Sequence, residues 1–77
     1  MVAAMDEVML QKCIDAGLRM TSQREAIARA LDQSSDHPDA ELLYQRAHKI
    51  DSTISFATIY RTLGVFERAG LVQKVDV

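Results

Sequence analysis

The sequence predicts a mainly α-helical fold with a small β wing at its C-terminal end. Four segments carry apolar residues at the spacing of helices that press one face onto a core. Residues 71–77 alternate imperfectly between apolar and polar side chains, as a strand does. Hydrophobic residues make up 48% of the 77, and only three glycines and one proline interrupt them. We therefore expect one domain over residues 1–77, near the lower size limit for folding on a hydrophobic core.

The first two helices are predicted over residues 6–16 and 22–33. Asp6 can cap the first helix and Gly17 can end it, and Thr21 can cap the second. The predicted inward-facing residues are Leu10, Cys13, Ile14 and Met9 in the first helix, and Ile27, Ala30 and Leu31 in the second.

The third and fourth helices are predicted over residues 39–50 and 56–69. A polar turn with a proline precedes the third helix, which Asp39 can cap, and residues 53–54 form at most a small strand. Ser55 can cap the fourth helix, and Gly70 stands where a left-handed residue ends a helix. The predicted inward stripes are Ala40, Leu43, Ala47 and Ile50, and then Phe56, Ile59, Leu63 and Phe66.

The order of these elements is that of a winged helix-turn-helix. The third and fourth helices form its helix-turn-helix, and the fourth lies in the major groove of DNA. A lone terminal strand leaves its backbone groups without a partner. We therefore expect the chain to be a fragment of a longer protein, cut within a hairpin.

The outer side of the predicted fourth helix favours DNA. Ala57, Tyr60, Arg61, Gly64 and Arg68 lie there, with no carboxylate among them. Small, aromatic and cationic side chains allow close approach, apolar contact with thymine methyls and neutralisation of phosphates. Periodicity alone is equally consistent with an ordinary amphipathic helix. A glycine in the middle of a helix lowers helix stability by about 1 kcal/mol relative to alanine, so Gly64 needs an explanation. Either the wall of the DNA groove approaches closely there, or the glycine is a tolerated evolutionary change.

Charge and cysteine content set further limits. The net charge is −2, but arginines gather at residues 19–31 and 56–75, and a local basic footprint is what DNA binding requires. The single Cys13 excludes an internal disulfide and is interpreted as a small buried hydrophobe rather than a reactive thiol. The sequence has no membrane-length apolar run and no signal peptide, which predicts a cytoplasmic protein.

Three blocks of sequence resemble the N-terminal domain of the ferric uptake regulator (Fur) family. They are G-L-R-M-T-S-Q-R at residues 17–24, D-H-P-D-A-E-L-L-Y at 36–44, and S-F-A-T-I-Y-R-T-L with E-R-A-G-L-V at 55–63 and 67–72. The resemblance implies a cytoplasmic, dimeric, metal-responsive bacterial repressor. Its winged-helix domain would bind double-stranded DNA at an A·T-rich operator, and a C-terminal domain, absent here, would dimerise and carry most metal ligands.

The resemblance also implies roles for single residues. Tyr60 would pack on a thymine, Arg61 would hold a phosphate, and Arg19 would reach into an A·T-rich minor groove, whose negative potential favours a cation. The candidate DNA-binding residues are Arg19, Ser55, Ala57, Thr58, Tyr60, Arg61, Thr62 and Gly64.

His37 matches a histidine that binds the regulatory metal in many relatives. Taken alone, a histidine in an acidic turn is an ordinary loop residue, and metal binding needs three or more convergent ligands. His48 has no obvious partner in the sequence. We expect no cofactor in this fragment, and Fe²⁺, Mn²⁺ or Zn²⁺ in the full-length protein, bound by His37 with ligands from the absent domain.

Two positions depart from the family's pattern. Ser22 replaces a proline, and both residues suit the start of a helix. Gly64 replaces a larger polar or basic residue, which puts one phosphate or base contact in doubt. We expect the protein to repress metal-uptake genes, with iron as the metal that the resemblance favours most. A manganese, zinc or peroxide sensor and a winged-helix protein-interaction module are the alternatives, and no arrangement of residues supports an enzyme.

Overall fold

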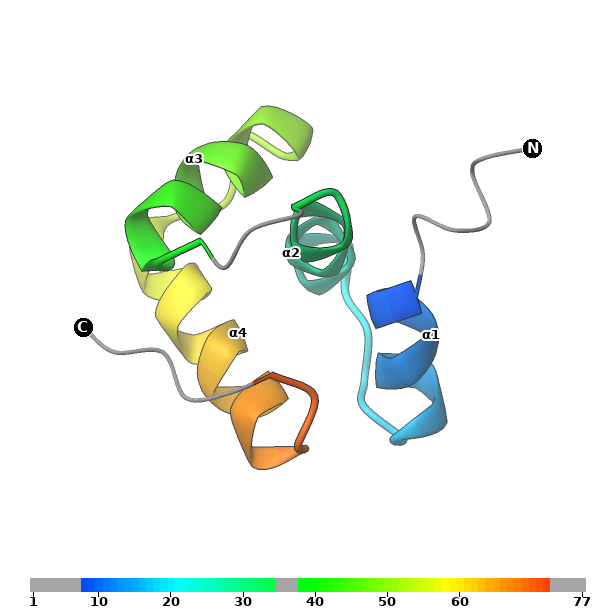
Figure 1. Cartoon of the computed structure of the whole chain (residues 1–77). Coiled ribbons are helices and arrows are strands. Elements are labelled where there is room, and N and C mark those ends of the chain that lie inside the picture. Colours follow the sequence, from blue (N-terminus) through cyan, green and yellow to red (C-terminus); the bar gives the residue numbers. More distant parts are fainter. Residues whose placement is uncertain (1–7, 35–37, 73–77) are drawn as a thin grey trace.

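The computed structural model describes residues 8–34 and 38–72, which form four helices. These are α1 (Val8–Asp15), α2 (Ser22–Asp32), α3 (Ala40–Ile50) and α4 (Phe56–Arg68). Figure 1 views α2 nearly end-on, with α1 on one side and α3 and α4 on the other. Helix α2 contacts each of the other three, so the core forms around it.

Three helices begin at the capping residues that the sequence predicts. The side chains of Thr21, Asp39 and Ser55 each accept a hydrogen bond from the backbone N–H three residues later, over 3.1, 2.9 and 3.2 Å. Each cap satisfies an N–H that has no carbonyl partner within its helix. The predicted starts of α2, α3 and α4 are therefore confirmed.

Helices α1 and α4 end in the same way, each on a glycine with positive φ. Gly17 has φ 78° and Gly70 has φ 76°. In each case the glycine N–H and the next N–H turn back onto carbonyls of the last helical turn, over 2.9 to 3.1 Å. This double closure is the Schellman motif, which favours glycine because it has no Cβ. The predicted role of both glycines is confirmed.

The start of α1 depends on another helix. Both carboxylate oxygens of Asp32, the last residue of α2, accept from the N–H of Met9, over 2.8 and 2.9 Å. A carboxylate at a helix N-terminus satisfies an unpaired donor and complements the helix dipole. The predicted cap, Asp6, lies outside the described residues.

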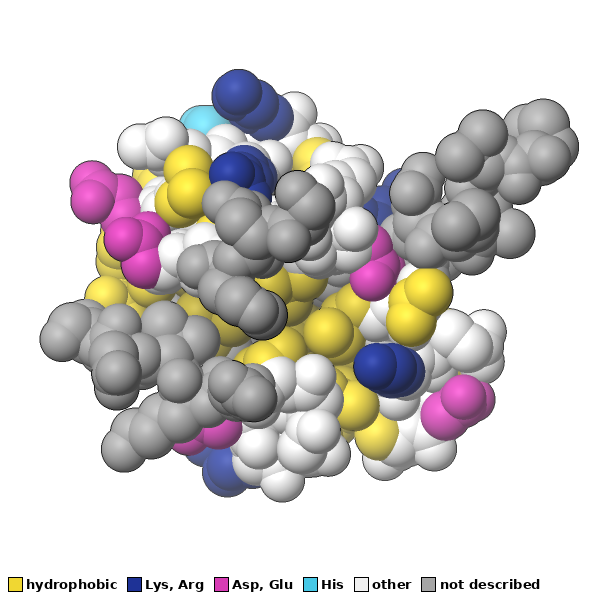
Figure 2. All heavy atoms as spheres, viewed as in Figure 1, with side chains coloured by type: hydrophobic (Ala, Val, Ile, Leu, Met, Phe, Trp, Pro, Cys, Tyr) yellow, Lys and Arg dark blue, Asp and Glu magenta, His cyan; other side chains and the backbone are white. Residues whose placement is uncertain are grey.

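The core follows the predicted stripes over most of their length. Apolar side chains gather in the middle of Figure 2, between α1, α2 and α4. The exposed Ile14 and Ile50 contradict the prediction. Cys13 and Ala47 face inward, so Ile14 is turned away on its helix, and Ile50 comes after the last turn of α3 that contributes to the core. The buried apolar side chains are Cys13, Ala26, Ile27, Ala28, Ala30, Ala40, Leu43, Ala47, Ile54, Ile59, Leu63 and Phe66.

Phe56 was predicted to lie in the core, and this prediction is wrong. Its side chain is 37% exposed, whereas Ile54, which precedes the cap of α4, is only 2% exposed. Ile54 and Ile59 belong to the same core cluster, as in a hydrophobic staple at a helix start. Ile54 therefore fills the core position at this end of α4, and Phe56 is left at the surface.

The described residues contain no strand. Residues 53–54 belong to the turn between α3 and α4 rather than to a small strand. Of the strand predicted at residues 71–77, Leu71 and Val72 are described and form a bend packed against the core. Residues 73–77, where the rest of the predicted wing falls, lie outside the described part.

Candidate nucleic-acid interface

The turn between α3 and α4 is held by side chains from α2, from α3 and from the C-terminal cap of α3. The Asp51 carboxylate accepts from the N–H and the hydroxyl of Thr53, over 3.0 and 2.5 Å. The Gln23 amide on α2 donates to the Thr53 hydroxyl and carbonyl, over 3.2 and 3.4 Å. His48 Nδ1 lies 3.3 Å from the carbonyl oxygen of Ile54. These contacts fix the start of α4 relative to α2 and α3.

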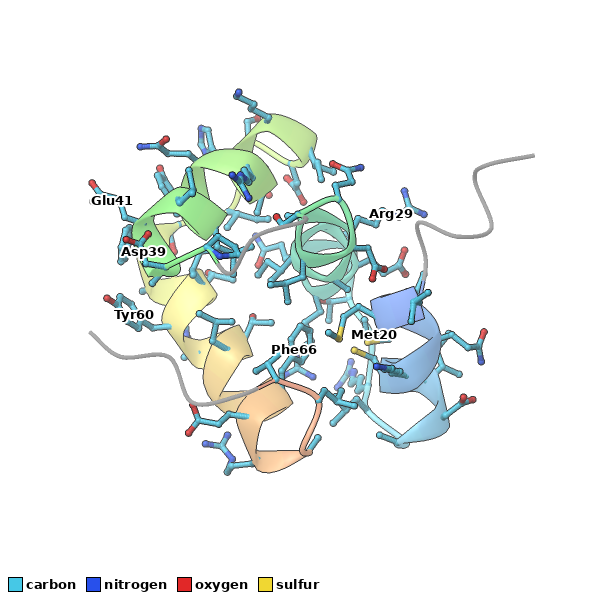
Figure 3. All side chains as sticks on the ribbon, in the orientation of Figure 1. Met20, Arg29, Asp39, Glu41, Tyr60 and Phe66 are labelled. Atoms are coloured by element: carbon cyan, nitrogen blue, oxygen red, sulfur yellow. The ribbon has the colours of Figure 1, made fainter. Side chains whose placement is uncertain are left out.

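The outer face of α4 is accessible, as the sequence predicts. We use this term for Ala57, Tyr60, Arg61, Gly64 and Arg68; Gly64 is half-buried and the other four are exposed. Figure 3 shows Tyr60 pointing away from the core, whereas Phe66 on the same helix points into it. The same helix therefore anchors itself with one face and presents a phenol and two guanidinium groups with the other.

Thr62 was predicted to contact DNA, but its side chain is only 3% exposed. It lies three residues after Ile59 and four before Phe66, both fully buried, so the helical period turns it inward. The other two hydroxyl candidates are bonded to each other, since Ser55 Oγ lies 3.0 Å from Thr58 Oγ1. Ser55 is exposed and Thr58 half-buried, so both remain near the surface at the start of α4.

A row of aromatic rings links α3 to Tyr60. The ring centroids are 5.2 Å apart for His48 and Tyr44, 5.3 Å for Tyr44 and Phe56, and 5.1 Å for Phe56 and Tyr60. The planes are tilted by 39° to 45°, within the usual range for aromatic pairs. This row was not predicted from the sequence. Two of its three pairs, 44 with 48 and 56 with 60, have the four-residue spacing of neighbours on a helix and could have been recognised.

Arg19 lies in the connector between α1 and α2, with an exposed side chain. The Arg24 guanidinium donates to the carbonyl oxygen of Arg19 over 2.7 Å. This bond ties the connector to the first turn of α2. The Arg19 side chain is thereby held at the surface on a fixed piece of backbone.

The outer face of α4 carries two cations, Arg61 and Arg68, and one carboxylate beside them, because the half-buried Glu67 lies two helical turns after Tyr60 on the same side of the helix. Within residues 8–34 and 38–72, we find no hydrogen bond or ion pair that engages the guanidinium of Arg61. Other carboxylates lie over the first turn of α3, at the edge of Figure 2, where Figure 3 labels Asp39 and Glu41. Hydrogen bonds from Thr53 lower the pKa of Asp51, which keeps that turn carboxylate ionised.

No group of three or more His, Cys, Asp or Glu residues suited to a metal ion occurs among the described residues. Cys13 is fully buried, which confirms its predicted burial, and the burial raises the pKa of its thiol. His48 faces Tyr44 and a backbone carbonyl rather than other ligands. His37 lies outside the described part of the chain.

The sequence profile of the ferric uptake regulator family matches residues 15–77. The chain belongs to this family. It is 52% identical over 64 residues to the ferric uptake regulation protein of Rhizobium leguminosarum bv. viciae, covering 83% of this chain and 45% of that protein. It is 45% identical over 60 residues to the peroxide-responsive repressor PerR of Staphylococcus aureus, covering 78% of this chain and 40% of that one.

Solved structures of this family share the fold. A manganese uptake regulator superposes with a TM-score of 0.84 at 45% identity, over 92% of this chain and 52% of that one. A zinc-bound manganese uptake regulator gives 0.82 at 46% identity, over 90% of this chain and 52% of that one. The chain thus spans about half the length of the relatives it matches. In the described part, none of the helices has the length and apolar character needed to span a membrane.

Proposed function

We propose that this chain is the DNA-binding domain of a metal-responsive transcriptional repressor of the Fur family, acting in the cytoplasm on metal-uptake genes. The observation that carries the proposal is the outer face of α4, where Tyr60 and Arg61 are exposed on a helix whose opposite face is buried. The family membership supports the same function. No reaction is assigned to the chain, in keeping with relatives that are named as regulators and repressors.

In this proposal α4 enters the major groove of an A·T-rich operator. The Tyr60 ring contacts a thymine methyl, and Arg61 neutralises a phosphate. Ala57 and Gly64 allow the helix to approach the bases closely, and Ser55 and Thr58 offer hydroxyls near the backbone of the DNA. Arg19 enters the adjacent minor groove from the connector that Arg24 holds in place.

We propose that metal binding requires a longer protein of which this chain is one domain. The described residues hold no ligand set of their own, so we propose that His37 binds Fe²⁺, Mn²⁺ or Zn²⁺ together with ligands from a C-terminal domain. Iron is the first choice, since the ferric uptake regulation protein is the more similar relative at 52% identity. PerR and the manganese uptake regulator are similar enough to keep peroxide, manganese and zinc as alternative signals.

Homodimerisation of the longer protein would bring two copies of α4 onto two half-sites. Once one half-site is bound, the linked second domain is held at a high effective concentration near the other half-site, so the overall affinity rises without any new contact. A winged helix that binds another protein instead of DNA remains the competing function, because a fold alone does not fix what it binds.

The test uses an A·T-rich duplex selected by this chain from a random library at low salt, with affinity measured by fluorescence anisotropy. Arg61→Ala should weaken binding to every duplex and reduce the slope of log K against log salt by about 1. Arg29→Ala is the matched control, because Arg29 is also exposed but projects from α2, away from the outer face of α4.

Tyr60→Ala is the complementary variant. It should cost roughly 1–3 kcal/mol at one or two base pairs and leave the salt slope unchanged. Failure to select any duplex, or equal affinity for the wild type, Arg61→Ala and Arg29→Ala, would refute the proposal and favour the protein-binding module.

A further inference from the structure

We propose that Phe56 is a positioning residue for Tyr60, and that it sets how well this domain discriminates thymine from bases without the 5-methyl group. The inference rests on the proposed function of Tyr60 and deepens it. Its basis is the row of rings from His48 to Tyr60, with Phe56 between the two tyrosines.

Tyr60 by itself is poorly constrained. Its side chain is 39% exposed and projects from the outer face of α4. Exposed side chains exchange rotamers within nanoseconds, and binding must then fix one of them at a cost in entropy. A contact with a single methyl group is sensitive to this cost, since the contact itself is weak.

Phe56 supplies the missing constraint. It is the first residue of α4, with its backbone fixed by the cap at Ser55, and it lies one helical turn before Tyr60. Its ring centroid stands 5.1 Å from that of Tyr60 at a tilt of 45°, close enough to block the space into which the phenol ring could swing. This contact accounts for a large apolar side chain that the core does not use.

The other end of the row is attached to the helix-turn-helix itself. Tyr44 on α3 packs against Phe56 on one side and His48 on the other, and His48 Nδ1 lies 3.3 Å from the carbonyl oxygen of Ile54 in the turn. The ring contacts therefore connect the packing of α3 against α4 to the position of the Tyr60 ring. The orientation of the phenol ring is a property of the motif rather than of one helix.

The first experiment measures Tyr60 without DNA, by NMR of its ring protons and χ1 couplings in the 77-residue chain. Phe56→Leu keeps an apolar side chain but removes the ring, and should move the Tyr60 ring shifts toward those of an isolated tyrosine and average its rotamers. Tyr44→Phe keeps every ring and should leave both readouts unchanged. Unchanged Tyr60 shifts and couplings in Phe56→Leu, with a native-like amide spectrum, would overturn the proposal.

The second experiment measures thymine discrimination on the selected duplex at low salt, with each thymine replaced in turn by uracil, which lacks only the methyl group. The wild type should lose about fourfold in affinity at the thymine that Tyr60 contacts, the value for burying one methyl-sized group. Tyr60→Ala should lose this sensitivity entirely. Phe56→Leu should keep less than half of it, with an unchanged salt slope.

The outcomes separate the two proposals. Equal uracil sensitivity in the wild type and Tyr60→Ala would remove the proposed role of Tyr60, and the positioning role with it. Sensitivity lost in Tyr60→Ala but kept in Phe56→Leu would overturn only the positioning role. A loss in Phe56→Leu at a thymine that Tyr60→Ala does not affect would also overturn it, because Phe56 would then contact DNA directly.

Discussion

The guanidinium of Arg68 lies over Gly64, with its Nη1 atom 3.5 Å from the point where a Cβ on that glycine would stand. Apart from Gly64, its two chain neighbours and the nearby backbone of α4, no other described atom comes within 4 Å of this point. The distance is an ordinary van der Waals contact, so alanine would fit without displacing the arginine. Packing among the described residues therefore does not require a glycine in the middle of α4.

Gly64→Ala should stabilise the domain. Alanine has the higher helix propensity and fits the space, so we expect the free energy of unfolding to rise by about 1 kcal/mol in urea titrations. Gly70→Ala is the matched control and should lower it by about 1–2 kcal/mol, because φ at Gly70 is 76°. A loss of stability in Gly64→Ala would show that the glycine meets a structural need.

Gly64→Ala should also weaken binding to DNA, because we propose that the outer face of α4 approaches the groove closely at this residue. The expected change is a lower affinity for the selected duplex despite the greater stability. Anisotropy titrations of both proteins at one salt concentration measure it. Equal affinities of the wild type and Gly64→Ala would indicate that the glycine is a tolerated change without a role in DNA binding.

Arg19 should read the minor groove at the flank of the site. Replacing the flanking A·T pairs with G·C pairs changes the groove and its negative potential, and should lower the affinity of the wild type but not that of Arg19→Ala. The measurement is the ratio of the two affinities for each protein. Equal losses in both proteins would count against this role.

Asp51 should make part of the stability depend on pH in the acid range. In the folded state, hydrogen bonds from the Thr53 hydroxyl and N–H hold the pKa of Asp51 below its ordinary value of 3.8. The contribution is therefore complete above about pH 3.8 and is lost as the pH falls through the lower, folded value. Urea unfolding from about pH 6 to pH 2 should show this loss in the wild type and not in Asp51→Asn.

Thr53→Val provides the control for that series, since it removes the hydroxyl donor and keeps the N–H. Its acid dependence should fall between those of the wild type and Asp51→Asn. An identical acid dependence in all three proteins would contradict the assignment of the pKa to these hydrogen bonds.

The 77-residue chain should not bind a regulatory metal tightly. His37 is the only ligand that we assign, and a stable site needs three or more. Calorimetry with Mn²⁺ or Zn²⁺ should show no stoichiometric binding of micromolar or better affinity, and His37→Ala should leave the titration unchanged. A stoichiometric site that His37→Ala abolishes would show that this chain supplies a complete ligand set.

The helix ends were predictable because their signals are local. Thr21, Asp39 and Ser55 bond to N–H groups three residues away, and Gly17 and Gly70 take a φ that other residues avoid. Such interactions need only a few neighbouring residues, so they can be recognised in the sequence. The exposure of Tyr60 and Arg61 followed in the same way from the period of one helix.

The sequence by itself therefore determined where the helices lie and which broad face of α4 points outward. Only the tertiary structure decided how far each apolar stripe is covered, because coverage depends on where the neighbouring helix ends. Ile54 occupies the core position expected for Phe56, and the Phe56 ring lies at the surface between Tyr44 and Tyr60. The bond from Gln23 to Thr53 joins residues 30 positions apart, and no local pattern specifies a contact at that separation.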